Sequence, residues 1–281
     1  MTSGPKPPQR IALVVSDIDG TLLDDKKQLT PGAPGAVQML YRARIRFTIA
    51  SARPPRMIRD LVRKLEVREP LACFNGALFV RPDETVLRKL PMSPLDAQKV
   101  ADDISQQGFD LWVWTDTDWY ASNPTGPHVA HHEDEMGRKA TPLPTRDLSK
   151  FDVLKLVGVS DDYDALAKAE QEVGALSASI SATRSSAYYL DVTDIKANKG
   201  EVVVTLSQML SIPTEQIVTI GDMSTDALMF HTSGISIAMG NALDDVKAQA
   251  TYVTRTNQED GFAYAMDHFI LASAGQRLAA D

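Results

Sequence analysis

The chain has 281 residues, a length that fits one large domain or two ordinary ones with room for a buried core. Hydrophobic residues make up 43% of it and charged residues 23%, values near the globular average that exclude general disorder and fibrous repeats. The net charge of -8 and the pI of about 5.2 would repel a polyphosphate backbone, so we expect no nucleic-acid partner, although a local cation can still hold one small phosphorylated ligand.

Cysteine content and the N-terminal segment bear on the compartment. Cys73 is the only cysteine in the sequence, so no internal disulfide can form and a reducing compartment, by default the cytoplasm, is the simpler setting. Residues 1–10 are polar and Pro-rich, and we interpret them as a flexible leader. The apolar run that follows is far shorter than a signal-peptide core or a membrane span, so we expect no membrane partner.

The first part of the chain alternates between strand and helix patterns. Residues 11–16 (IALVVS) are continuously apolar, which is typical of a strand buried on both faces of a parallel sheet. Apolar residues at helical spacing predict helices over residues 34–44 and 55–65, and short apolar runs predict strands over residues 46–50 and 71–74. This order predicts an α/β fold with a doubly wound parallel sheet.

The pattern loosens in the middle of the chain and then returns. Between about residues 85 and 189 it predicts an inserted second domain, whose elements are a helix at 96–107, strands at 110–115 and 153–159, and a helix at 163–173. The doubly wound order resumes with a helix at 201–210, a strand at 216–220, a helix at 225–232, strands at 235–238 and 252–254, and a helix at 260–272. We therefore expect a core whose two halves lie at the two ends of the chain.

Two aspartates stand directly after the first expected strand. Asp17 and Asp19 are two residues apart, so their carboxylates leave the strand on the same face. In an open α/β sheet, ligands bind just beyond the carboxyl ends of the strands. Two close carboxylates repel each other and favour a bound cation, and oxygen ligands at a phosphate site favour magnesium. The competing interpretation is an ordinary Asp-rich turn, which Gly20 also suits.

A second acidic pair shifts the balance towards a metal site. Asp222 and Asp226 follow the expected strand at 216–220, so two strand ends can share one cation. Asp226 also suits the first turn of the next helix, a common position for aspartate.

Two further positions suit phosphate. Ser51 follows the second strand near the start of a helix, where a hydroxyl and a backbone N–H can meet a phosphate oxygen. Lys199 precedes the helix at 201–210, and its ammonium can neutralise phosphate charge there. Each signal is weak alone, because Ser51 can be a helix N-cap and most lysines simply face solvent.

In this order the positions resemble the four motifs of the haloacid-dehalogenase superfamily of phosphohydrolases. The long insertion between Ser51 and Lys199, with the segments 75–77 (NGA), 239–242 (MGNA) and 257–261 (NQEDG), resembles the Cof-type, sugar-phosphatase-like branch. The resemblance runs from Ile11 to about Phe269. It implies a Rossmann-like catalytic core, residues 11–84 and 190–281, with residues 85–189 as an inserted α/β cap domain.

The resemblance also implies an activity and a role for each site residue. It implies a magnesium-dependent phosphatase that hydrolyses a small phosphomonoester, a sugar phosphate or similar, through an aspartyl-phosphate. Asp17 would be the nucleophile, and Asp19 the acid that protonates the leaving alcohol and then activates water. The implied metal ligands are Asp17, Asp222 and the backbone carbonyl of Asp19, with Asp226 holding the metal's water shell. The implied phosphate-binding residues are Ser51, Ala52, Lys199 and Thr225.

Two positions depart from the family pattern. Thr225 stands where the family usually has asparagine, and a hydroxyl has one donor and less reach than an amide. Ala52 stands where the family usually has glycine, so alanine must make a turn that glycine makes without steric cost. We expect the second change to be tolerated because the hydroxyl of Ser51 is kept.

The expected cap contains two groups of residues with ambiguous roles. His131 and His132 are adjacent to acidic residues, but no metal-ligand spacing repeats elsewhere, so we expect a solvated cap surface. The other group consists of Trp112, Trp114 and Trp119, whose rings can form the floor of a sugar-binding pocket. We favour the interpretation that they simply pack on one face of a sheet.

Three other functions remain open at this point. A receiver module also places a phosphorylated aspartate on a doubly wound sheet, but receivers are shorter and lack a large insertion. The second is a phosphomutase of the same superfamily. The third is a non-catalytic phosphate-binding protein, which Thr225 favours slightly. The sequence encodes neither the substrate nor the oligomeric state in a legible way.

Overall fold

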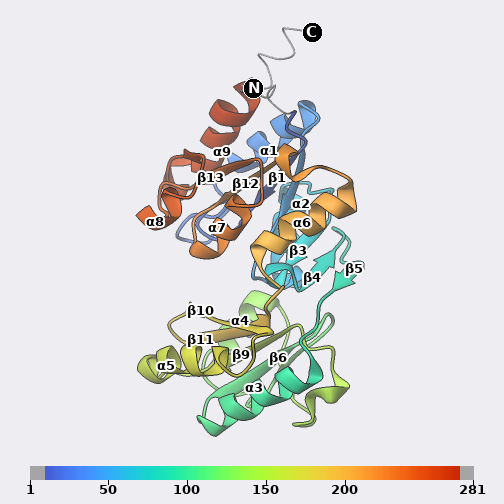
Figure 1. Cartoon of the computed structure of the whole chain (residues 1–281), viewed down its shortest axis with the longest axis vertical. Coiled ribbons are helices and arrows are strands. Elements are labelled where there is room, and N and C mark those ends of the chain that lie inside the picture. The colour runs from blue at the N-terminus through green and yellow to red at the C-terminus, as the bar shows by residue number, and fades with distance from the viewer. Residues whose placement is uncertain (1–9, 273–281) are drawn as a thin grey trace, which may run out of the picture.

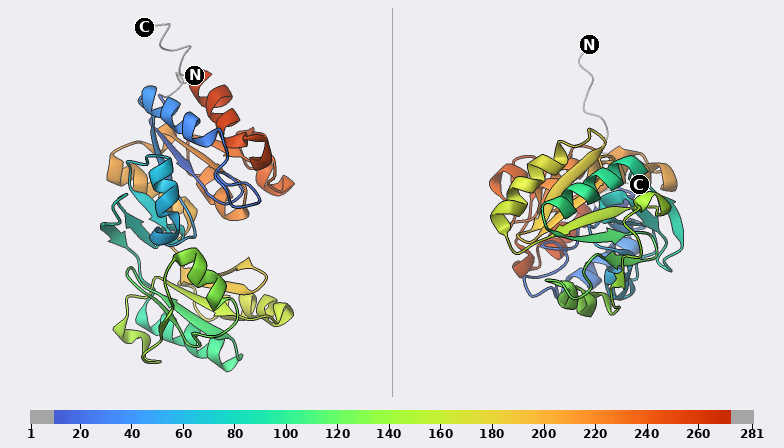
Figure 2. Two further views of the ribbon diagram at one scale, coloured as in Figure 1. Left: turned by 180° about the vertical axis from the view of Figure 1, so that it is seen from behind. Right: turned by 90° about the horizontal axis from the view of Figure 1, so that it is seen from below.

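The computed structural model describes residues 10–272, so all but the last residue of the expected leader lies outside the described residues. Figures 1 and 2 show two bodies stacked along the long axis of the molecule. Blue to cyan and orange to red segments, from the two ends of the chain, share the upper body in Figure 1, and the green to yellow segment forms the lower one. We call these bodies the core and the cap.

The core is built on a five-stranded parallel sheet with the order β14-β13-β12-β1-β2. Its strands are β1 (Leu13–Ser16), β2 (Arg46–Ile49), β12 (Ile217–Gly221), β13 (Ile235–Ala238) and β14 (Tyr252–Val253). β1 pairs with β12, more than 200 residues later in the chain, with Leu13 opposite Ile217. The expected split core is therefore present.

Helices cover both faces of this sheet. They are α1 (Ala33–Arg42), α2 (Pro55–Lys64), α6 (Lys199–Leu210), α7 (Ser224–Phe230), α8 (Asp244–Lys247) and α9 (Gly261–Ala265), which continues as a π-helical turn (Met266–Leu271). Val14 packs in the cluster that holds α1, α2 and α9, whereas Leu13 and Val15 pack in the cluster that holds α6, α7 and α8. This alternation explains why the sequence of β1 is continuously apolar.

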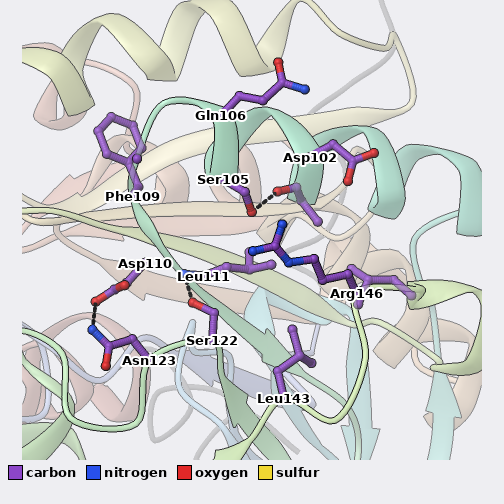
Figure 3. Close-up of a pocket in the computed structure, with 13 residues that line it drawn as sticks. Asp102, Ser105, Gln106, Phe109, Asp110, Leu111, Ser122, Asn123, Leu143 and Arg146 are labelled. Carbon is purple, nitrogen blue, oxygen red and sulfur yellow. Dashed lines mark hydrogen bonds between the residues drawn. The ribbon is translucent and has the colours of Figure 1, made fainter.

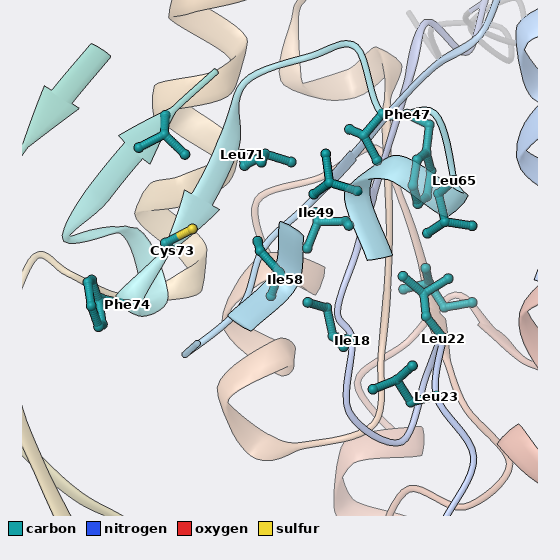
Figure 4. Packing of buried hydrophobic residues seen from close by; sticks show 14 of the residues in the cluster. Ile18, Leu22, Leu23, Phe47, Ile49, Ile58, Leu65, Leu71, Cys73 and Phe74 are labelled. Carbon is teal, nitrogen blue, oxygen red and sulfur yellow. The ribbon is translucent and has the colours of Figure 1, made fainter. Parts of the chain in front are cut away.

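The packing against α2 is dense. Figure 4 shows Ile18, Phe47, Ile49, Ile58 and Leu65 meeting in one apolar layer, and each is almost fully buried. Burial of side chains of this size stabilises the fold by about 1.5–3 kcal/mol each. The layer fixes the start of the loop that follows β1, where the expected catalytic aspartates lie.

A small three-stranded antiparallel sheet lies beside β2. It consists of β3 (Leu71–Cys73), β4 (Leu78–Val80) and β5 (Val86–Lys89), and a parallel bridge between Ala50 and Ala72 joins it to the core. β3 was expected, but β4 and β5 were not. Every residue of β5 is exposed, so this strand has no buried face to give an apolar alternation.

The cap contains a six-stranded mixed sheet with the order β10-β11-β9-β6-β7-β8. Its strands are β6 (Asp110–Trp114), β7 (Trp119–Ala121), β8 (Thr141–Pro142), β9 (Lys155–Val159), β10 (Ile180–Ser186) and β11 (Tyr189–Asp194). The helices α3 (Pro94–Gln106) and α5 (Tyr163–Gly174) cover one face, and α4 (Val129–Met136) lies on the side towards the core. None of the helices within residues 10–272 has the length and apolar character needed to cross a membrane.

Sheet membership shifts both expected domain boundaries. β11 pairs with β9 and β10, so the chain leaves the cap sheet after Asp194 rather than at residue 189. β5 pairs with β4, so the chain enters the cap after Lys89 rather than at residue 85. The β10-β11 hairpin was not predicted from the sequence, because much of β10 is polar and exposed and has no clear apolar alternation.

Candidate active site

One large cavity lies between the core and the cap, at the carboxyl ends of β1, β2 and β12. Its volume is about 920 Å³. Seven of the residues predicted to form the site line it: Asp17, Asp19, Ser51, Ala52, Lys199, Asp222 and Thr225. The eighth, Asp226, is fully buried on α7, directly beneath the wall of the cavity.

A buried ion-pair network joins the two halves of the core. Lys199, the first residue of α6, donates to Asp17 Oδ1 at 2.5 Å and to Asp226 Oδ1 at 2.6 Å. Lys199 is only 4% exposed and Asp17 only 6%, so the network is shielded from solvent. The other oxygen of Asp226 accepts the backbone N–H groups of Asp222 and Met223 at 3.0 and 2.9 Å. Asp226 therefore also caps the start of α7, the alternative role that the sequence suggested for it.

Asp222 is held beside Asp17 but keeps one oxygen free. Its Oδ2 accepts from Asn241 Nδ2 at 3.2 Å, whereas its Oδ1 is buried with no hydrogen-bond partner among the described residues. Gly20, with a φ of +76°, lies so close that a Cβ there would meet Asp222 Oδ2 at 2.2 Å. Glycine is therefore required at this position on both conformational and steric grounds.

This cluster contains more carboxyl groups than basic groups. Ligand atoms of Asp17, Asp222 and Asp226 lie within 4.8 Å of one another, against the single ammonium of Lys199. Burial raises the pKa of Asp17, and burial together with Asp226 raises the pKa of Asp222 to about 7. Burial lowers the pKa of Lys199, but Asp17 and Asp226 outweigh it and hold that pKa above its ordinary value. A cluster with excess carboxylate and an unpartnered oxygen on Asp222 fits a divalent cation.

Asp17 and Asp222 are better placed than Asp226 to bind a divalent cation. Both oxygens of Asp226 already accept hydrogen bonds, so it is poorly placed to bind a cation directly. Asp17 and Asp222 are the residues that could hold one.

Asp19 lies on the same wall with basic partners that the sequence did not suggest. Arg53 donates to both of its carboxylate oxygens at 2.6 and 2.7 Å, and Lys27 donates to Oδ1 at 2.8 Å. Burial raises the pKa of Asp19, but the bonds from Arg53 and Lys27 outweigh it and leave that pKa below its ordinary value. Asp19 is therefore ionised in this arrangement, and Arg53 must move away before it can carry a proton.

The predicted phosphate-binding residues have separate environments. Ser51 is 2% exposed and its Oγ accepts the N–H of Arg53 at 3.2 Å, so its hydroxyl proton remains available. Because α2 begins only at Pro55, Ser51 is not a helix N-cap. Ala52 does not belong to the described residues with a positive φ, which explains why alanine is tolerated there. Thr225 lies in the first turn of α7 and lines the cavity.

Asn241 links the loops around the site. It donates to the carbonyl of Gly20 at 3.0 Å as well as to Asp222, and its Oδ1 accepts the N–H of Asn257. Asn257 in turn donates to the carbonyl of Leu23 at 3.0 Å. The segments 239–242 and 257–261 supported the family resemblance, but only the structure gives these positioning contacts.

The cap residues left ambiguous by the sequence form one aromatic cluster. The rings of Trp112, Trp114 and Trp119 lie 4.9–5.4 Å from that of His132. The expectation that both histidines face solvent is wrong for His132, because α4 packs it against these rings and its side chain is only 12% exposed. It is right for His131, whose side chain is 66% exposed. The three tryptophans pack together, as the favoured interpretation of the sequence predicted, and Trp112 and Trp114 also line the cavity.

A second hollow of about 450 Å³ lies on the helix-covered face of the cap, between α3 and β6 (Figure 3). Its polar groups largely bond to one another: Ser122 Oγ accepts the N–H of Leu111 at 2.9 Å, and Asn123 donates to Asp110 at 3.2 Å. None of the predicted site residues lies there. The larger cavity is therefore the candidate active site.

Comparisons with known proteins agree with this geometry. The chain is 27% identical over 282 residues to a 5-amino-6-(5-phospho-D-ribitylamino)uracil phosphatase of Bacillus subtilis, covering 92% of this chain and 97% of that protein. It is 26% identical over 258 residues to a putative phosphatase of Haemophilus influenzae, covering 90% of this chain and 96% of that protein. A solved haloacid dehalogenase-like hydrolase from Bacteroides thetaiotaomicron superposes with a TM-score of 0.82 at 24% identity, covering 93% of this chain and 100% of that one.

The family assignment covers both bodies of the molecule. Residues 14–266 match the family described as haloacid dehalogenase-like hydrolase, a range that begins in β1 and ends after α9. The match includes the cap as well as both halves of the core, and it confirms the resemblance carried by the aspartate, serine and lysine motifs. The chain belongs to the family of haloacid dehalogenase-like hydrolases.

Proposed function

We propose that this hydrolase is a magnesium-dependent phosphatase that cleaves a small phosphomonoester through an aspartyl-phosphate on Asp17. The observation that carries the proposal is the buried contact of Asp17 with Lys199, beside Asp222, at the end of β1. A carboxylate fixed in a cavity next to a cation is suited to nucleophilic attack on phosphorus.

The reaction divides into two steps. In the first, Oδ2 of Asp17 attacks phosphorus, the bond from phosphorus to the ester oxygen breaks, and Asp19 gives a proton to the leaving alcohol. In the second, Asp19 takes a proton from water as the water oxygen attacks phosphorus, and Asp17 leaves as a free carboxylate. Phosphate is released and both aspartates return to their starting states.

Arg53 has a part in the timing of these steps. Its two hydrogen bonds to Asp19 stabilise the ionised carboxylate, which is the state needed to activate water. Protonation of Asp19 before the first step requires that these bonds loosen.

Asp17, Asp222 and the backbone carbonyl of Asp19 would hold Mg²⁺, with Asp226 orienting its water shell. When bound, the metal would supply positive charge that offsets the phosphate oxygens. Lys199 would contribute a second positive charge, while Ser51, the N–H of Ala52 and Thr225 would donate hydrogen bonds to the phosphate.

The substrate is a small phosphorylated metabolite, a sugar phosphate or a similar ester, and we place the reaction in the cytoplasm. The single buried cysteine is compatible with a reducing compartment. The name of the Bacillus relative adds phosphorylated ribitylaminouracil to the esters worth testing. We expect neither a nucleic acid nor a membrane as partner.

The other functions are less well supported. A receiver module has no counterpart for a cap inserted between the halves of its core, and the family match covers that cap. A phosphomutase would need a phosphorylated-sugar activator, so the absence of any activator requirement would exclude it. A non-catalytic protein would bind phosphate without releasing it from an ester.

Metal dependence gives a direct test with p-nitrophenyl phosphate as substrate. We expect excess chelator to abolish phosphate release and Mg²⁺ to restore it, because a cluster of carboxylates cannot bind a phosphate dianion unaided. The same titration with the Asp222→Asn variant should require more metal. Full activity in excess chelator would contradict the proposal.

A further inference from the structure

Arg53 lines the cavity from the core side, just before the start of α2. Its guanidinium donates to Asp19 through Nε at 2.7 Å and through Nη2 at 2.6 Å. A guanidinium is a planar fork with further N–H groups, and among the described residues those of Arg53 have no other acceptor. Its side chain is 21% exposed, so it retains room to change its partner.

A direct contact between the two bodies fixes the end of α4 against the start of α2. Arg56 Nε, in the first turn of α2, donates to the carbonyl of Met136, the last residue of α4, at 2.9 Å. The last carbonyls of a helix have no partner inside it, so this bond satisfies one of them. α4, green in Figure 2, packs against α2 at this point. Because Glu135 directly precedes Met136, the contact brings Glu135 of the cap towards Arg53.

Glu135 lines the same cavity and has only distant partners. Its Oε2 lies 3.6 Å from His132 Nδ1 and its Oε1 3.8 Å from His131 Nε2, both too far for a hydrogen bond. The interaction with His132 outweighs burial and, with a smaller contribution from Arg53, holds the pKa of Glu135 below its ordinary value, so its carboxylate is ionised. Among the described residues, no ion pair joins Glu135 to Arg53 in this arrangement. The two charges therefore interact through the cavity without direct contact.

The two oxygens of Asp19 differ in what they would lose if Arg53 moved. Oδ1 accepts from Lys27 as well as from Arg53, whereas Oδ2 accepts from Arg53 alone among the described residues. Departure of Arg53 would leave Asp19 paired with Lys27, so it would not create an isolated charge in the cavity. It would, however, free Oδ2 to reach the oxygen of the leaving alcohol. An acceptor for the displaced guanidinium is then needed, and Glu135 is an ionised carboxylate on the facing wall.

We infer that Glu135 is a positioning residue of the cap that takes Arg53 over from Asp19, so that Asp19 Oδ2 is free to pass a proton to the leaving alcohol. The inference rests on the proposed phosphatase function and adds to it a cap residue that acts on the core chemistry. Glu135 itself touches no reacting atom. The step that it promotes is the transfer of the proton from Asp19 to the ester oxygen as the bond from that oxygen to phosphorus breaks.

The test compares phenyl phosphate with p-nitrophenyl phosphate, two aryl esters of similar shape. Phenolate is the poorer leaving group, so its departure depends more strongly on proton donation. In Glu135→Gln, the ratio of kcat/KM for phenyl phosphate to that for p-nitrophenyl phosphate should fall about 10–100-fold, because a charge-assisted bond to Arg53 is lost. Asp134→Asn removes the same charge from the preceding residue of α4, which is exposed and does not line the cavity, and should leave the ratio unchanged.

A double-mutant cycle tests whether Glu135 acts through Arg53. Glu135→Gln added to Arg53→Met should leave the ratio at the value that Arg53→Met alone sets, because the guanidinium that Glu135 accepts is gone. An equal fall of the ratio in both backgrounds, or an unchanged ratio in Glu135→Gln alone, would overturn the inference while leaving the phosphatase proposal intact. No turnover of either ester by the unmodified protein would instead contradict the proposed function itself.

Discussion

The core and cap walls of the cavity are built in different ways. On the core wall, Asp17, Asp222 and Lys199 stand at strand or helix ends, where the buried ammonium of Lys199 holds the carboxylate of Asp17 and the amide of Asn241 holds that of Asp222. On the cap wall, side chains such as Trp112 and Asp191 project from the middle of strands, where the sheet pleat sets their direction and neighbouring side chains of the cap contact them.

This difference suggests that the core wall carries out the chemistry and the cap wall recognises the substrate. The core wall is held by hydrogen bonds that connect segments far apart in the sequence, so little variation is compatible with its geometry. We expect the cap wall to accept changes of one side chain at a time, because backbone hydrogen bonds hold its strands together. We therefore expect substitutions on the core wall to affect every substrate, and substitutions on the cap wall to affect substrates selectively.

The largest expected effect is on the core wall, in the variant Asp17→Asn. An amide cannot form the acyl phosphate, so kcat should fall by about 10⁴-fold or more with every ester, including p-nitrophenyl phosphate. Thermal melting should show that the protein still folds, because the amide can keep the volume of the side chain. Near-normal turnover by this variant would remove Asp17 from the chemistry.

A smaller effect is expected in the cap, from the loss of a ring that does not line the cavity. Trp119 is 1% exposed and stacks on Trp114 with ring centroids 5.4 Å apart. Trp119→Ala should lower the free energy of unfolding by about 3–5 kcal/mol because it leaves a large void in the aromatic cluster.

Urea denaturation would measure this change, with Trp119→Phe as a matched variant that keeps one ring and should lose less. Since Asp222 lies on the opposite wall, the folded Trp119→Ala protein should keep its affinity for magnesium. Equal stability of the two variants would show that the cluster does not support the cap.

The core was predictable from sequence for a physical reason. Strands buried on both faces, such as β1 and β12, have continuous apolar runs, and the carboxylates that follow them stand out against that background. The sequence alone thus predicts that Asp17 and Asp222 lie at strand ends that can share one cation. The family resemblance then supplied their expected roles.

The cap was less predictable because its signals are weak or non-local. β10 contains the polar run Thr183 to Ser186, and α4 follows a polar loop, so neither gave a clear apolar period. The bond from Arg53 to Asp19 depends on how two loops meet, and the burial of His132 on α4 depends on three tryptophans from β6 and β7. Sequence spacing does not encode either contact.

The most direct test of the account is whether phosphate becomes attached to Asp17 and stays there when Asp19 is disabled. In Asp19→Asn the carboxylate that activates water is lost, while the backbone carbonyl at this position is kept. General acid-base catalysis contributes about 10²–10⁴-fold to each step, but p-nitrophenolate leaves without much protonation. Formation of the aspartyl-phosphate should therefore continue while its hydrolysis slows.

Rapid-quench kinetics with p-nitrophenyl phosphate, followed by mass spectrometry of the quenched protein, would measure both steps. The account predicts a burst of p-nitrophenol and a phosphoryl group on the peptide that contains Asp17, with steady-state turnover reduced by about 10²–10⁴-fold. Asp222→Asn should instead raise the magnesium requirement without trapping the intermediate. Turnover of Asp19→Asn at the rate of the unmodified protein, with no burst and no phosphorylated peptide, would contradict the account.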